Sequence, residues 1–68
     1  MTPERMIHLA NQIAFFFQPY THEEAVDGIV SHLKQFWEPR MLRQIKAYVA
    51  ENGTGLHPSV VDAVKRMQ

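Results

Sequence analysis

The sequence contains no cysteine. A disulfide framework, a thiolate nucleophile and a cysteine-ligated zinc or iron–sulfur site are therefore excluded. Long apolar runs are also missing, because the longest extends only from Ile13 to Phe17, whereas a membrane-spanning helix needs about 20 such residues. The first residues lack the basic-then-apolar layout of a signal peptide. We therefore expect a cytoplasmic protein with no part in a membrane.

A net charge is likewise absent, because seven basic residues balance seven acidic ones. Nucleic-acid affinity rests largely on neutralised phosphates, so a neutral chain argues against that class of partner. The charges are nevertheless unevenly placed. Residues 1–30 hold one basic residue against four acidic ones, and residues 31–50 hold four basic residues against one acidic. This asymmetry fits either complementary helix surfaces within one fold or a basic face presented to an acidic partner.

What is present is a globular composition, with 46% hydrophobic and 21% charged residues in a chain of 68. That length predicts a single domain over residues 1–68. Thr2 and Pro3 are typical of a helix start, Thr21 and Glu24 of a capping box, and Pro39 of a third helix start. The expected helices cover about 3–18, 22–37, 39–51 and 58–67. No segment alternates as a strand does, so we predict an all-α fold, a small antiparallel bundle of three main helices plus a short C-terminal helix.

The apolar stripes predict which helix faces are buried. In the first helix the helical period selects Met6, Ala10, Ile13 and Phe17, widened by neighbours that include Phe16, and it places Phe15 on the opposite side. In the second helix it selects Ala25, Ile29, Leu33 and Phe36, with Trp37 on the flank. Gly28, in the middle of that helix, predicts a close helix crossing, because glycine lets two backbones approach.

Residue patterns that carry catalysis are weak. No two of the four histidines are three or four residues apart, so no helix face offers a metal-binding pair. The acidic residues Glu23, Glu24 and Asp27 fall at a helix start, where they favour the helix dipole. The glycines of residues 52–55 lack the flanking motif of a phosphate loop. We predict that the chain is not an enzyme.

Two other function classes stay open. Arg40, Arg43 and Lys46 recur every three residues on the third helix, which would suit the recognition helix of a small helix-turn-helix-like DNA-binding regulator. Steep salt dependence of duplex binding would identify that class. A small hydrolase or a metal protein with a site assembled across helices is the third possibility, and a screen for bound metal would reveal it.

Aromatic residues are the most informative feature. Three consecutive phenylalanines end the first helix, and Phe36 and Trp37 end the second. Aromatic side chains and arginine dominate the energetics of protein interfaces. A small bundle cannot bury every side of one helix, so Phe15 is either singly exposed or buried against another chain. These residues favour a binding module, and they also predict that the isolated chain can self-associate.

Two blocks of sequence resemble one family over nearly the whole chain. They are Leu9-Ala10-Asn11-Gln12-Ile13-Ala14 with the phenylalanines after it, and Phe36-Trp37-Glu38-Pro39-Arg40-Met41. Together with Glu24-Ala25, Gly28-Ile29, His32 and, near the end, Gly55-Leu56, Pro58, Val60 and Val61, they resemble the delta subunit of NAD-dependent formate dehydrogenase. Leu42 departs from the pattern, since a basic residue is expected there and Arg43 follows one position later.

This resemblance implies a non-catalytic accessory subunit of a soluble, molybdenum- or tungsten-dependent formate dehydrogenase. The chain would dock on the large catalytic subunit and either stabilise the complex or assist its assembly and cofactor insertion. It would bind no cofactor itself. The complex would hold bis-molybdopterin guanine dinucleotide, iron–sulfur clusters, FMN and NAD on other subunits.

The candidate partner-binding residues are taken from the aromatic and arginine side chains that suit an interface and from the blocks that carry the resemblance. Trp37, Arg40 and Met41 form the centre, supported by His32 and Phe36. Asn11, Gln12 and Phe15 form a second candidate patch. Phe36 and Trp37 fit a role in the core equally well, and His32 fits a helix contact. Arg40 is the hardest of them to place in a core, so its substitution gives the best test of partner binding.

Overall fold

A computed structural model describes residues 1–68 as four helices with no strand. They are α1 (Pro3–Phe16), α2 (His22–Phe36), α3 (Pro39–Glu51) and α4 (Pro58–Met67). The all-α prediction is confirmed. The expected bounds of α3 and α4 hold, whereas α1 and α2 end two residues and one residue earlier than expected. Both of these ends lie shortly before a proline, which disfavours helical backbone at the residue preceding it.

The helix starts are built by the caps that the sequence predicts. The Thr21 hydroxyl oxygen accepts a hydrogen bond from the backbone N–H of Glu24 at 3.2 Å, and a Glu24 carboxylate oxygen accepts one from the Thr21 N–H at 3.1 Å. The Thr2 hydroxyl caps α1 in the same way by accepting from the Arg5 N–H. His57 supplies an unforeseen cap for α4, because its Nδ1 accepts from the Ser59 N–H.

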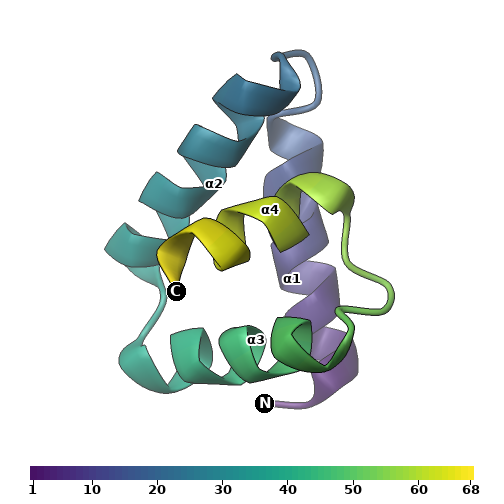
Figure 1. Ribbon diagram of the computed structural model, residues 1–68, viewed down its shortest axis with the longest axis vertical. Coiled ribbons are helices and arrows are strands. Elements are labelled where there is room, and N and C mark those ends of the chain that lie inside the picture. The colour runs from purple at the N-terminus through teal and green to yellow at the C-terminus, as the bar shows by residue number, and fades with distance from the viewer.

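The helices are not arranged as three antiparallel helices with a short addition, so that part of the expectation is not met. Figure 1 shows that α1 and α2 diverge from the loop that joins them. Helix α3 crosses at their far ends, and α4 lies between α1 and α2. Helix α4 contacts each of the other three helices. Val60, Ala63 and Val64 of α4 have no exposed surface. The shortest helix is therefore the central element of the core.

The buried side of α1 is rotated from the predicted one. Met6, Ala10 and Ala14 are buried, whereas Ile13 and Phe17 are only half-buried. The small alanine side chains let α1 pack close to the core that α4 fills. As a result, the apolar side chains next to the buried stripe are left at the surface, and they contribute to the groove described below.

Two ion pairs and a hydrogen bond between a histidine and a carboxylate join α2 to α4. Arg66 pairs with Glu23, where Nη2 and Oε1 are 2.7 Å apart, and also with Asp27. His22 Nε2 lies 2.7 Å from a carboxylate oxygen of Asp62. The hydrogen bond that Arg66 donates to Glu23, assisted by the one to Asp27, raises the pKa of Arg66 above its usual value. The acidic residues near the start of α2 thus pair with Arg66 of α4, and not with the basic residues of α3.

Gly28 lies where α2 meets the end of α1. A Cβ atom at this position would overlap the far edge of the Phe17 ring. The prediction of two closely approaching backbones is not confirmed, because the neighbour of Gly28 is a side chain. The glycine therefore makes room for an aromatic ring that sits between the two helices.

We expect Gly28→Ala to destabilise the fold by about 1 kcal/mol. Overpacking against Phe17 costs about 1–3 kcal/mol, and alanine regains about 1 kcal/mol of helix propensity. In a Phe17→Leu background the clash is relieved, so the same substitution should become stabilising. Urea denaturation of the original chain, the two single variants and the double variant measures both effects. If Gly28→Ala changed the free energy of unfolding with the same sign in both backgrounds, the contact between residue 28 and the Phe17 ring would be contradicted.

Candidate functional site

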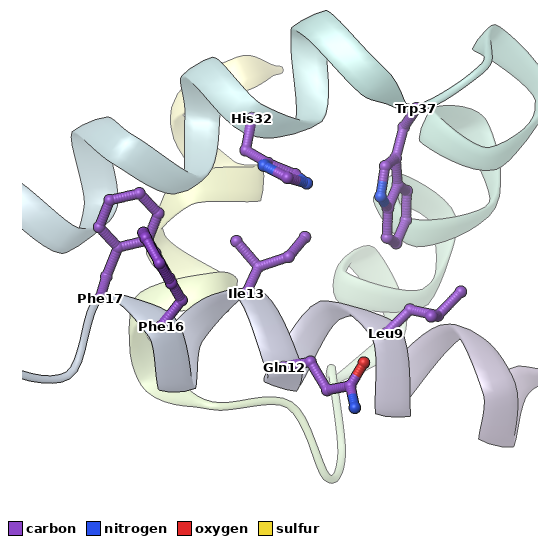
Figure 2. A pocket seen from close by; sticks show the side chains of 7 residues that line it. All are labelled: Leu9, Gln12, Ile13, Phe16, Phe17, His32 and Trp37. Atoms are coloured by element: carbon purple, nitrogen blue, oxygen red, sulfur yellow. The ribbon is translucent and has the colours of Figure 1, made fainter.

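A groove opens between α1 and α2, and it encloses about 430 Å³. Figure 2 shows its lining, which comes from the two helices and from the residue that follows each of them. The lining residues are Leu9, Gln12, Ile13, Phe16, Phe17, His32 and Trp37. Five of the seven are hydrophobic, and this composition is typical of a binding cleft.

One end of the groove is aromatic because of the contact between Phe17 and Gly28. Phe16 and Phe17 meet edge to face, with ring centroids 5.1 Å apart. Phe17 is half-buried against α2, while Phe16 remains 71% exposed. Phe16 thus presents a large apolar surface that this fold does not cover.

The other end is formed by Trp37, which follows the last residue of α2. Its backbone is extended, with φ −87° and ψ 135°, and this turn away from the helix lets the indole pack into the core at 9% exposure. Phe36 was predicted to lie in the buried stripe, but it is 64% exposed. Its ring packs against His32 instead, with centroids 4.8 Å apart.

The lining of the groove carries no permanent charge. Gln12 of α1 and His32 of α2 supply its polar side chains, together with the indole N–H of Trp37, and Figure 2 shows His32 directed toward α1 above Ile13. An apolar groove with a few placed polar groups selects ligands by shape and by a small number of hydrogen bonds.

The sequence-based candidates fall on three parts of the molecule. Trp37, His32 and Gln12 line the groove, and Phe36 stands beside it. Arg40 is exposed and Met41 is half-buried, both in the first turn of α3. Asn11 and Phe15 lie elsewhere and line a second, more polar concavity of about 420 Å³ together with Gly55 and His57.

Asn11 has a structural task in this fold. Its Nδ2 donates to the carbonyl of Gly55 at 2.9 Å, and its Oδ1 accepts from the N–H of His57 at 2.8 Å. Gly53 and Gly55 have φ values of 67° and 88°, a conformation that glycine adopts readily. Asn11 therefore fastens the turn between α3 and α4 to α1.

Sequence reasoning missed Leu9, Ile13 and Phe16 as groove residues, and it assigned Ile13 and Phe16 to the buried stripe. One signal could have found them. The apolar arc of α1 includes Met6, Ile7, Leu9, Ala10, Ile13, Ala14, Phe16 and Phe17. Such an arc is wider than one core-facing stripe of about 100°.

The structure brings together no group of three or more histidine, aspartate or glutamate side chains that could hold a metal ion. No helix is long and apolar enough to cross a membrane. Neither buried polar atoms without a partner nor strained non-glycine backbone mark a further site. The groove is the feature with the clearest capacity for binding.

Comparison with protein families gives one match. The family model of the NADH-dependent formate dehydrogenase delta subunit FdsD matches residues 5–64 of the 68-residue chain. No curated protein and no solved structure matches significantly. The matched range contains all the groove residues.

Proposed function

The chain belongs to the delta-subunit family of NADH-dependent formate dehydrogenases, and from this premise we propose that it is a non-catalytic accessory subunit. It docks on the molybdopterin-containing large subunit and stabilises the complex or assists its assembly. Membership of the family makes the chain one subunit among several. The large subunit as the partner, and the docking itself, are our proposal.

The observation that carries the proposal is the exposed aromatic surface at the groove. Phe16 is 71% exposed at one end and Phe36 is 64% exposed near the other, beside the largely buried Trp37. Phenylalanine and tryptophan side chains of this kind supply much of the energy of protein association. A subunit that docks through the groove would bury them.

The same reasoning favours a supporting role over a catalytic one. A chain without cysteine supplies no thiolate for an iron–sulfur cluster. We propose that the molybdopterin, iron–sulfur, FMN and NAD sites belong to other subunits. A chain that binds only the folded form of its partner raises the free energy of unfolding of that partner, and the gain grows with the concentration of the free chain.

The character of the groove bears on how assembly is assisted. Bis-molybdopterin guanine dinucleotide carries pyrophosphate groups, and the groove lining includes no lysine or arginine to meet them. We therefore favour a role in which the chain holds a polypeptide surface of the large subunit. A role in which this groove carries the cofactor to its site is less favoured, because an uncharged groove does not complement negative pyrophosphate groups.

The experiment is co-purification of a tagged copy of this chain from cells that express the whole complex. We expect the large subunit to be recovered with it, together with its flavin and iron–sulfur companions. Removing the chain should then lower the amount of intact complex, and the metal content per large subunit distinguishes stabilisation from cofactor insertion. Recovery of none of these subunits would contradict the proposal, and recovery of nucleic acid alone would favour the DNA-binding alternative.

A further inference from the structure

We propose that the groove between α1 and α2 receives an amphipathic helix of the large catalytic subunit. The apolar side of that helix packs on Ile13, and acidic residues of the same helix flank its apolar side. This inference rests on the proposed function, because it names what fills the groove when the subunit docks. The hydrogen-bonding capacity of the groove, its lack of charge and the charges around it support this inference.

The groove favours a helix because it offers little to an extended backbone. Its walls are two helices whose own N–H and C=O groups are already paired, and the fold has no sheet edge to which a strand could add. The polar lining consists of Gln12, His32 and the indole N–H of Trp37. An extended segment would bury unpaired N–H and C=O groups at a cost, whereas a helix satisfies its own backbone.

The lining also restricts the side chains of the occupant. Leu9 and Ile13 line the groove on the α1 side, and aromatic rings stand at both ends. An aspartate, glutamate, lysine or arginine placed among these side chains would lose water without gaining an ion pair. The residues that enter the groove are therefore apolar, spaced three and four apart as along one side of a helix.

The charges outside the groove favour an acidic flank on that helix. Glu23 and Asp27 are already paired with Arg66, and Asp62 with His22. By contrast, Arg40, Arg43 and Lys46 of α3 form no ion pair, and Arg40 lies three residues after Trp37. Arg5, Lys34 and Lys65 are also unpaired, but α3 is the one helix with three such cations. These three begin shortly after Trp37, and they complement an acidic surface.

A second copy of the chain suits the groove less well. Paired copies would bring the basic α3 surfaces of the same chain toward one another, since a twofold interface uses the same patch twice. A standard interface buries about 800 Å² of each partner, which is under a fifth of the 4519 Å² surface of this chain. A larger subunit can extend its contact from the groove over Phe36 and the start of α3, which this fold leaves exposed.

Photo-cross-linking within the co-expressed complex tests the occupant. Benzoylphenylalanine replaces Gln12, which lines the groove, and in a matched control it replaces Ser31, an exposed residue of α2 outside the lining. We expect the Gln12 probe alone to label one segment of the large subunit, at positions three or four residues apart, with acidic residues within that segment.

Other outcomes of the cross-linking would overturn the inference. They are labelling of an extended or proline-rich segment, labelling of a second copy of this chain, recovery of a small molecule in the groove, or no labelling although the chain stays in the complex. In each of these cases the proposed function survives. It fails separately if the unmodified chain does not retain the large subunit at all.

A charge substitution tests the acidic flank. Arg40→Gln should weaken binding of the large subunit at least fivefold, and this loss should shrink at high salt. Lys65→Gln removes one exposed positive charge from α4, which contributes no residue to the groove, and should change binding less than twofold. Equal effects of the two substitutions would overturn the assignment of the acidic flank to the Trp37 end.

Discussion

Replacing Val60 with aspartate should unfold the chain. Val60 has no exposed surface and lies in α4, which contacts the other three helices. Aspartate has a similar size, so the substitution mainly places a charge in the core. An unpaired buried carboxylate costs several kcal/mol, whereas a domain of 68 residues has a total stability of roughly 3–10 kcal/mol. Circular dichroism and urea denaturation measure the outcome.

Val61→Asp is the matched control, because it makes the same chemical change at the next residue. Val61 is only half-buried, packed near Gly53 at the edge of the core. A carboxylate there can reach water, so we expect a loss of about 1 kcal/mol and a folded protein. If the two variants had equal stability, α4 would not be the centre of the core, and the three-helix arrangement predicted from the sequence would regain support.

The local structure could be predicted from the sequence because its causes are local. The capping box of Thr21 and Glu24 and the prolines at the starts of α1, α3 and α4 fix where helices begin. Gly53, with its positive φ, follows the end of α3, a position where glycine is common. Each of these signals acts within a few residues, so no knowledge of the tertiary fold is needed to recognise it.

The packing could not be predicted in the same way, because it depends on which helix occupies the centre. The apolar arc of α1 allows two buried stripes, one through Ala10 and Ala14 and one through Ile13 and Phe17. Periodicity ranks them about equally. The central position of α4 favours the stripe of small residues, and the rejected stripe becomes a wall of the groove.

The junction after α2 shows a similar limit at the level of one residue. Helical spacing continues the buried stripe to Phe36, but the helix ends there and the extended backbone of Trp37 carries the indole into the core. A helical projection cannot represent a side chain that follows the last helical residue. The exposure of Phe36 beside His32 is therefore a consequence of where α2 stops.

The candidate site was predictable in its residue types more than in its location. Trp37, His32 and Gln12 were identified from the sequence blocks that carry the family resemblance, and they meet in one groove. Asn11 was drawn from the same blocks, yet it fastens the turn at Gly55 and His57. A residue can be characteristic of a family because of folding or because of binding, and hydrogen-bond partners distinguish the two.

Phe16→Ala should weaken docking on the large subunit by about 2 kcal/mol, roughly 30-fold in Kd. The side chain is 71% exposed at the end of the groove, so a partner in the groove would bury a ring that this fold leaves uncovered. The free energy of unfolding of the isolated chain should change by less than about 0.5 kcal/mol, since little of the ring is buried. Titration of the chain into a complex prepared without it gives the affinity.

Phe15→Ala is a closely matched control for Phe16→Ala. The two phenylalanines are adjacent, and their exposed fractions are nearly equal at 74% and 71%. They differ in the surface that they serve, since Phe15 lines the concavity with Gly55 and His57. Loss of affinity with Phe16→Ala alone places the partner in the groove between α1 and α2. Loss with Phe15→Ala alone would move the interface to the second concavity, where Asn11 would combine a folding role with a binding one.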